Sequence, residues 1–132
     1  MVIVTGVPNS GKSLLAEEFT GKGLFVFHTD SMKDMPWGDA IQKIKKLMDE
    51  DKYDVMIGVK MLAAVRSWLK HHEKGKPCET FVWCSRPLKA LTPGQLTQAK
   101  GLLTQWDEIR QDLDRRGVDI VLGSRAIREK LG

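Results

Sequence analysis

The octet Gly6–Ser13, read as GVPNSGKS, most constrains how this chain can fold, because it directly follows the apolar run Met1–Val4. That run is β-branched and closed by a glycine, which predicts a short strand buried on both faces. Residues 12–20 then carry leucine and phenylalanine at helical spacing, and Gly21 ends the pattern. A buried strand joined to a helix by a glycine-containing loop is typical of the first unit of a parallel α/β sheet.

The alternation of strand and helix patterns continues along the rest of the chain. Further strands are predicted over residues 24–27, 54–59, 80–84 and 118–122. Further helices are predicted to begin near Pro36, Met61, Thr92 and Ser124. Strands connected by helices form right-handed units with the strands parallel, so we expect an α/β three-layer α/β/α sandwich around a mainly parallel five-stranded sheet.

The size and composition fit one domain over residues 1–132. Hydrophobic residues make up 42% of the chain and charged residues 29%, which is ordinary for a folded domain. The net charge of +4 permits a polyanionic partner without requiring one. Cys84, in the apolar run FVWC, is expected to be a buried free thiol. No apolar run reaches the roughly 18 residues of a membrane span, so we expect an intracellular, reduced protein without a membrane partner.

The octet fits the phosphate-binding loop, or Walker A, pattern G-x-x-x-x-G-K-[ST] at every fixed position. Gly6 and Gly11 let successive backbone N–H groups point inward, and the helix that follows directs its positive dipole end at the same place. Lys12 adds a full positive charge, and the Ser13 hydroxyl is a ligand for Mg²⁺. We therefore expect ATP and Mg²⁺ as cofactors. The expected nucleotide-binding residues are Gly6, Pro8, Asn9, Ser10, Gly11, Lys12, Ser13 and Leu14.

A carboxylate at the end of the second predicted strand indicates the type of reaction. A guanine-reading N-K-x-D motif is absent from the sequence, and the third predicted strand ends Ile57-Gly58 without the acidic pair of an ATPase motor. Asp30 follows the second strand, where a small kinase needs a base that accepts the proton of the attacking hydroxyl. Asp30 is also a candidate metal ligand, and its alternative role is that of a helix cap or turn former. Asp34, one turn later, either assists substrate binding, binds metal, or is a helix cap or turn former.

Phosphoryl transfer also requires positive charge over the phosphates. Arg66 follows the third predicted strand and Arg86 follows the fourth, and each is either catalytic or an ordinary surface or ion-pairing residue. Because ligands bind beyond the carboxyl ends of parallel strands, Thr5, Asp30, Gly58 and Arg86 are expected to line one cleft. The candidates for substrate binding near that cleft are His28, Lys33, Asp34, Trp37, Lys89 and Lys100. His28 and Trp37 also have a structural alternative, as a packed histidine and a core or helix-staple tryptophan.

These residues together resemble a family of small phage P-loop kinases that act on 5-hydroxymethyluracil in DNA. The resemblance covers nearly the whole chain. It comprises the octet, His28-Thr29-Asp30 with Pro36-Trp37, Gly58-Val59 with Arg66, Arg86-Pro87, the stretch LTPGQ at 91–95, and Lys100-Gly101 through Trp106-Asp107-Glu108-Ile109. The LTPGQ stretch with the following Lys-Gly and Trp is the most specific part. Asn9 departs from the family, since a glycine is usual at that position.

The resemblance implies a P-loop NTPase-type fold and ATP-dependent phosphorylation of the hydroxymethyl oxygen as a step in DNA base hypermodification. It implies that Lys12 and Ser13 bind ATP and Mg²⁺, that Asp30 is the base, and that Arg66 or Arg86 stabilises the transferred charge. It also implies a location in the cytoplasm of a phage-infected bacterial host. Flanking DNA phosphates would meet basic residues, for which the candidates are Lys33, Lys89, Arg110, Arg115 and Arg116. For the last three, the alternative is a solvated helix face.

Two alternatives to this function stay open from the sequence. The first is a kinase for a polynucleotide 5′ end or a free nucleotide, which would use the same loop and the same aspartate. The second is a nucleotide-binding regulatory protein with little turnover, which the missing carboxylate after Ile57 favours. The sequence does not indicate the oligomeric state.

Overall fold

The computed structural model describes residues 1–131, and within them five strands form one sheet. The strand order is β2-β3-β1-β4-β5, and every neighbouring pair is parallel. The strands are β1 (Val2–Gly6), β2 (Val26–His28), β3 (Val55–Ile57), β4 (Thr80–Cys84) and β5 (Asp119–Leu122). The prediction of a five-stranded parallel sheet is confirmed.

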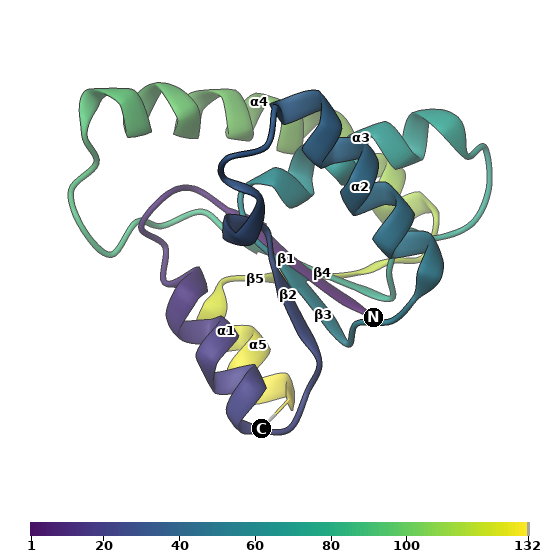
Figure 1. Ribbon diagram of the computed structural model, residues 1–132, viewed down its shortest axis with the longest axis horizontal. Helices are drawn as coiled ribbons and strands as arrows, with labels where there is room; N and C mark the ends of the chain where they lie inside the picture. The colour runs from purple at the N-terminus through teal and green to yellow at the C-terminus, as the bar shows by residue number, and fades with distance from the viewer. Residues whose placement is uncertain (132) are drawn as a thin grey trace.

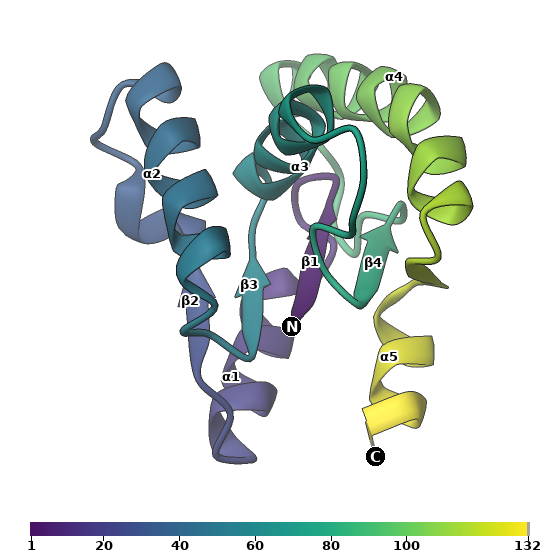
Figure 2. The ribbon, with the colours of Figure 1, turned by 90° about the vertical axis from the view of Figure 1, so that its right-hand side faces the viewer.

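Helices cover both faces of this sheet and make it the middle of three layers. The helices are α1 (Lys12–Gly21), α2 (Trp37–Glu50), α3 (Lys60–His71), α4 (Pro93–Arg115) and α5 (Ser124–Leu131), with a short 3₁₀ helix η1 (Thr29–Met32) after β2. Helices α1 and α5 pack on one face, and α2, α3 and α4 pack on the other (Figures 1 and 2). The helix predicted to follow a Ser124 cap begins at Ser124 itself.

Alternating side chains along each strand separate the core into two halves. In β1, Ile3 faces the cluster under α2, α3 and α4, whereas Val4 faces the cluster under α1 and α5. The larger half contains an aromatic stack in which the Trp106 ring lies 5.3 Å from Phe81 and 5.2 Å from Trp83, measured between ring centroids. This stack fixes the long α4 helix against β4, so the start of α4 is held in a defined place.

The second strand begins and ends later than the sequence predicts. Its expected first residues, 24 and 25, lie outside the ladder, because the backbone N–H of Phe25 donates to the Asp54 carboxylate at 2.7 Å. At the other end, β2 includes His28, and η1 follows at once. The third strand is shorter than predicted and ends at Ile57. The carboxyl ends of β2 and β3 therefore lie side by side, since His28 pairs with Ile57 in the parallel register.

Gly58 allows this close approach of the two strand ends. Its φ of +145° lies in a region that residues with a side chain rarely adopt, and a Cβ atom on it would lie 1.8 Å from Thr29 Oγ1. Thr29 is fully buried beneath it. A glycine at this position thus lets the segment that carries Asp30 pack directly on the end of β3.

Arg116 binds backbone carbonyl groups within the protein. It is therefore not placed to bind a DNA phosphate, and the proposed DNA contact of this residue is corrected. Its guanidinium donates to the carbonyl oxygens of His72 at 2.6 Å, Leu69 at 3.3 Å and Gly75 at 3.3 Å. These groups lie at or just after the end of α3, where helix carbonyls lack partners within the helix. Arg116 therefore closes the end of α3 against the end of α4.

The two cysteines are buried free thiols, as expected for Cys84. Burial raises the pKa of Cys78 to about 12 and also raises that of Cys84, so both stay protonated near neutral pH. Among residues 1–131, no helix combines the length and the apolar character needed to cross a membrane.

Candidate functional site

The Gly6–Ser13 loop connects the end of β1 to the start of α1 and is held tightly against β4. A Cβ atom on Gly6 would lie 2.1 Å from the carbonyl oxygen of Cys84, so only glycine fits beside that strand. Gly11 adopts a left-handed φ of +87° directly before α1. Asn9 also has a positive φ, of 60°, which asparagine tolerates better than most residues. The loop therefore adopts its tight curve with asparagine at this position.

Lys12 folds back over this loop. Its Nζ donates to the carbonyl oxygen of Val7 at 2.6 Å, to that of Gly6 at 3.3 Å and to Ser10 Oγ at 3.0 Å. Burial lowers its pKa from 10.5 to about 8, although the nearby Cys84 and Asp30 act in the opposite direction. A positive charge held away from water is stabilised strongly by any anion that reaches it, and this makes the loop a candidate anion site.

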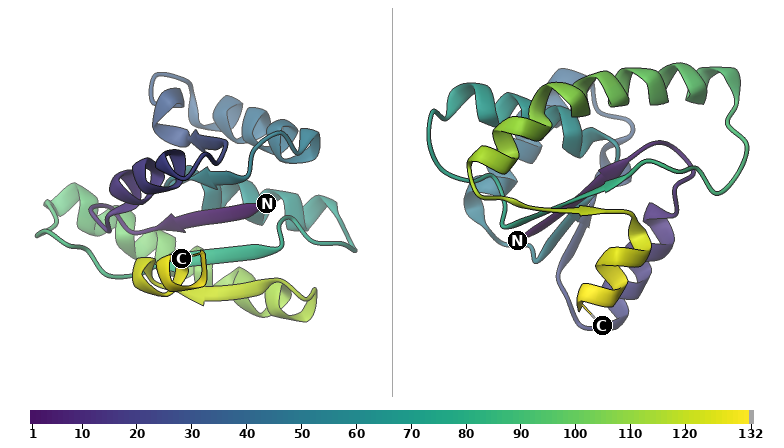
Figure 3. Two further views of the ribbon diagram at one scale, coloured as in Figure 1. Left: turned by 90° about the horizontal axis from the view of Figure 1, so that it is seen from below. Right: turned by 180° about the vertical axis from the view of Figure 1, so that it is seen from behind.

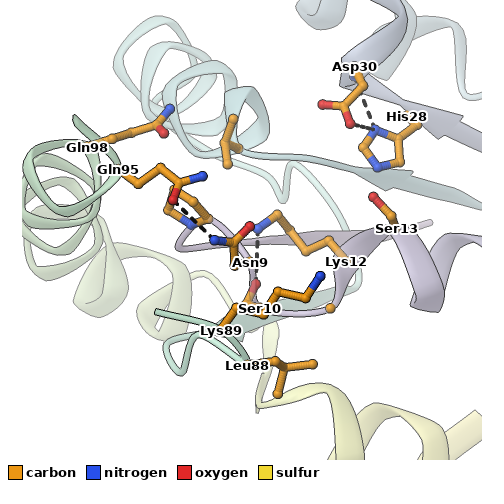
Figure 4. A pocket seen from close by; sticks show the side chains of 13 residues that line it. Asn9, Ser10, Lys12, Ser13, His28, Asp30, Leu88, Lys89, Gln95 and Gln98 are labelled. Carbon is orange, nitrogen blue, oxygen red and sulfur yellow. Dashed lines mark hydrogen bonds and ion pairs between the residues drawn. The ribbon is translucent and has the colours of Figure 1, made fainter. Parts of the chain in front are cut away.

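A cavity of about 470 Å³ opens over the loop (Figure 4). It is lined by Pro8, Asn9, Ser10, Gly11, Lys12, Ser13, His28, Asp30, Val59, Leu88, Lys89, Gln95 and Gln98. In Figure 4, Asp30 and His28 lie on one side and Gln95 and Gln98 on the other. The cavity thus combines the loop with a carboxylate from the end of β2 and with amide side chains from the start of α4.

His28 holds the segment that carries Asp30. The imidazole Nδ1 accepts a hydrogen bond from the backbone N–H of Asp30 at 3.1 Å, and the same nitrogen lies 3.6 Å from Asp30 Oδ2. The Ser31 hydroxyl donates to the carbonyl oxygen of His28 at 2.9 Å. These local contacts turn the chain into η1 at the strand end, so that the exposed Asp30 carboxylate reaches the cavity.

The start of α4 is tied to the loop through Asn9. Thr92 and Gln95 form a capping box at the helix N-terminus, as the Thr92-Pro93 pattern suggests. Gln95 Oε1 accepts from Thr92 N at 3.0 Å and also from Asn9 Nδ2 at 3.1 Å. The backbone N–H of Leu88 donates to the carbonyl oxygen of Asn9 at 2.6 Å. The segment between β4 and α4 therefore lies against the loop, as Figure 3 shows in its right-hand view.

A second cavity, of about 450 Å³, shares Ser10 and Leu88 with the first. Its remaining lining comes from the end of β4, the end of β5 and the start of α5. These residues are Cys84, Ser85, Arg86, Leu122, Gly123, Ser124 and Arg125. The cavity combines exposed apolar surface on Leu88 and Leu122 with two arginines and hydroxyl groups. The two cavities therefore adjoin at Ser10 and Leu88.

Most of the loop residues expected from the sequence line the first cavity, together with His28, Asp30 and Lys89. The expectation that four strand-end residues share one cleft is wrong for three of them. Thr5 and Gly58 are buried beneath the surface, and Arg86 lines the second cavity. Leu14 points outward and is 53% exposed, because α1 turns its apolar face toward the sheet at Leu15 instead.

Arg66 lies away from the loop. Its Nε lies 2.8 Å from Glu108 Oε2 of α4, and it lines a separate hollow between α3 and α4 with Leu69, Lys70, Glu108, Ile109 and Asp112. Because α3 runs away from the end of β3, Arg66 in the second turn of α3 lies far from the strand ends that border the loop. The ion pair is the alternative that the sequence left open for this arginine.

The other substrate-binding candidates lie outside the cavity lining. Trp37 begins α2 and is 49% exposed, with Lys60 Nζ placed 5.6 Å from its ring centroid. Lys33 and Asp34 are exposed at the end of η1, and Lys100 is exposed on α4. None of these four belongs to the described lining of the first cavity.

The sequence reasoning missed the contribution of α4 and of the segment before it. Leu88, Gln95 and Gln98 from this region, and Val59 directly before α3, line the cavity but were not among the expected site residues. Gln95 is part of the LTPGQ stretch, which carried the resemblance without a role. Its position three residues after Thr92 signalled a capping box, but its second contact, to Asn9, bridges 86 positions of sequence.

Searches against protein-family models and against curated proteins find no match to this chain. The function is therefore inferred from the geometry of the site and from the motifs in the sequence.

Proposed function

We propose that this chain is a P-loop NTPase-type kinase that transfers the γ-phosphoryl group of ATP to the hydroxymethyl oxygen of 5-hydroxymethyluracil in DNA. The proposal is carried by one observation, that the Lys12 loop and the Asp30 carboxylate line the same cavity. Phosphoryl transfer needs an anion site for the donor beside a base for the acceptor.

The residues around the loop suit a nucleoside triphosphate. The ammonium of Lys12 is bonded only to neutral oxygens in the contacts described, and phosphate oxygens would replace these with charged partners. Lys89 lines the same cavity and adds a second positive charge. The second cavity, with its apolar surface and Arg86, is suited to the base and sugar of the nucleotide, because Ser10 borders both cavities.

Ser13 and Asp30 are the proposed Mg²⁺ ligands, and both line the cavity. Residues 1–131 contain no group of three or more histidine, cysteine, aspartate or glutamate side chains suited to a metal ion. One or two protein oxygens, with the remaining positions filled by phosphates and water, is the usual arrangement for Mg²⁺. When bound, the ion would neutralise charge on the β- and γ-phosphates.

Asp30 is the proposed base. Its carboxylate would accept the proton from the acceptor hydroxyl as that oxygen forms a bond to the γ-phosphorus. The bond from the γ-phosphorus to the bridging oxygen breaks at the same time, and ADP leaves with that oxygen. Lys12 would stabilise the transferred charge, because its Nζ is held at the loop and Asp30 lies near enough to raise its pKa.

The acceptor is assigned from the family resemblance and from the openness of the site. The Asp30 side chain is 70% exposed, so a large acceptor has access to it. A base inside a duplex must leave the stack to enter a cavity of this kind, at a cost of a few kcal/mol. The net charge of +4 favours the approach of a polyanion.

A labelling assay tests the proposal. The purified protein, Mg²⁺ and ATP labelled at the γ-phosphate are mixed with duplex DNA that contains either 5-hydroxymethyluracil or thymine, with the 5′ ends blocked or open. We expect label in the 5-hydroxymethyluracil DNA whether its ends are blocked or open. Equal labelling of both DNAs that disappears on blocking would replace the proposal with an end kinase. Absence of label in all samples would indicate a nucleotide-binding protein with little turnover.

The Asp30→Ala variant separates binding from transfer. We expect it to lose transfer by at least about a hundredfold while ATP affinity falls by no more than a few fold, because the carboxylate acts on the acceptor and Ser13, the phosphates and water still hold the Mg²⁺. Asp34→Ala is the matched control, since Asp34 is an exposed aspartate outside the cavity lining. Equal effects of the two substitutions would remove Asp30 from the role of base.

A further inference from the structure

His28 lies between two functional parts of the cavity. Its Nδ1 accepts the Asp30 N–H at 3.1 Å, and both His28 and Ser13 line the cavity wall. Figure 4 shows the other ring nitrogen, Nε2, on the edge of the ring that faces Ser13. A single side chain thus contacts the Asp30 segment on one edge and faces the loop on the other.

The hydrogen bond at Nδ1 determines where the proton of a neutral ring lies. A nitrogen that accepts a hydrogen bond carries no proton, so the proton is on Nε2 and makes it a donor. This Nε2 is buried and has no hydrogen-bond partner among the described residues. A buried donor without an acceptor is costly, so such a group at a cavity wall indicates a ligand that accepts from it.

The other two histidines have no such arrangement. His71 Nδ1 lies 2.8 Å from the Ser67 carbonyl oxygen, and His72 Nδ1 lies 2.8 Å from the Trp68 carbonyl oxygen, both near the end of α3. Neither lines the cavity. Their ring nitrogens contact carbonyl oxygens near the end of α3, whereas the His28 ring binds the backbone of the segment that carries Asp30.

We propose that His28 is a positioning residue that links the occupant of the loop to Asp30. Nδ1 fixes the backbone of Asp30, and the Nε2 proton is donated to a phosphate oxygen bound beside Ser13. This inference rests on the proposed function, because it assigns to the occupant a phosphate and to Asp30 a role in transfer. It changes the sequence-based expectation for His28, from contact with the acceptor to orientation of the base.

Two substitutions separate the two nitrogens. Asparagine places an oxygen near the position of Nδ1, where it can accept the Asp30 N–H as an N-cap, but it lacks the second nitrogen. Glutamine extends an amide toward the position of Nε2 but leaves the acceptor near Asp30 unfilled. His28→Asn should therefore keep the orientation of Asp30 and lose the phosphate contact, and His28→Gln should do the reverse.

The kinetic test measures kcat with 5-hydroxymethyluracil DNA and the affinity for ATP separately. We expect His28→Asn to keep kcat within about threefold. It should weaken ATP binding about tenfold, which corresponds to the loss of one charge-assisted hydrogen bond. We expect His28→Gln to lower kcat about tenfold with ATP affinity nearly unchanged. His71→Asn, an exposed histidine on α3, is the control and should change neither value. Equal behaviour of the two His28 variants would overturn the division of roles.

A measurement without turnover distinguishes this inference from the proposed function. Nitrogen-15 spectra of the His28 ring should show the proton on Nε2, and addition of a non-hydrolysable ATP analogue should shift that resonance. A proton on Nδ1, or no response to the analogue, would overturn the inference even if the wild-type protein labels DNA. If the resonance responds but no DNA is labelled, the link between loop and Asp30 stands and the proposed acceptor falls.

Discussion

The Nζ atom of Lys12 donates a hydrogen bond to the carbonyl oxygen of Val7 at 2.6 Å, so the lysine is held by the loop that precedes it. The Lys12 ammonium is therefore already in position at the loop before a ligand binds, and it has lost most of its contact with water. The pKa of about 8 follows from that burial.

ATP affinity should fall as pH rises above about 8, since the free protein then loses the proton of Lys12. Bound phosphates favour the charged form, so binding above pH 8 should take up a proton. Calorimetry in two buffers of different ionisation enthalpy measures this uptake. Lys12→Arg should abolish the pH dependence because arginine stays charged. An affinity that is constant from pH 7 to 9.5 would contradict the burial of this charge.

The stability of the nucleotide-free protein should change with the opposite sign. Between pH 8 and 10.5 the unfolded chain keeps the proton that the folded Lys12 has released, so the free energy of unfolding should rise with pH. Urea titrations at several pH values, compared with those of Lys12→Met, isolate this contribution. A wild-type slope equal to that of the variant would show that Lys12 does not contribute.

Substitutions of Arg66 and Arg86 should affect ATP binding differently, because the two arginines lie in different parts of the structure. Arg66 is paired with Glu108 between α3 and α4, so Arg66→Met should leave ATP affinity and transfer within about twofold. Arg86 lines the second cavity, so Arg86→Met should weaken ATP binding about tenfold. Titration with a fluorescent ATP analogue measures both. A large loss with Arg66→Met alone would require α3 to move toward the loop.

Gly58 and Gly101 should respond oppositely to alanine. A Cβ on Gly58 would meet Thr29 Oγ1 at 1.8 Å at a positive φ, so Gly58→Ala should destabilise the protein by about 3 kcal/mol. Gly101 lies within α4 with nothing within 4 Å of its position for a Cβ, so Gly101→Ala should stabilise by about 1 kcal/mol. Thermal unfolding of both variants checks the two signs. A neutral Gly58→Ala would show that the β2 end can shift away.

Arg115 and Arg116 are neighbours with different expected roles. Arg116 is 9% exposed and bonds three carbonyl oxygens, so Arg116→Ala should cost about 2–3 kcal/mol of stability. Arg115 is 75% exposed, and Arg115→Ala should change stability by less than about 0.5 kcal/mol. Urea unfolding measures both. A stable Arg116→Ala variant with weakened DNA binding would return Arg116 to the DNA-contacting set.

Much of the architecture could be read from local patterns. The order of strands and helices depends on apolar runs, glycines and caps, which act over a few residues, and it matches the structure except at element ends. The shortened β3 and the late start of β2 were missed because they depend on Gly58 packing on Thr29 and on Asp54 binding Phe25, which are contacts between strands.

In the candidate site too, some features could be predicted from local sequence and others depend on tertiary contacts. The sequence alone determined that residues 6–13 form a tight loop with a lysine at the start of a helix, because that geometry follows from glycine positions and spacing. The sequence also predicted Asp30 in the cleft beside this loop, whereas only the tertiary structure decided that Gln95 reaches Asn9 and that Arg66 points elsewhere. The physical reason is that parallel strands align their carboxyl ends at one edge, whereas the direction in which each following helix leaves that edge is set by packing.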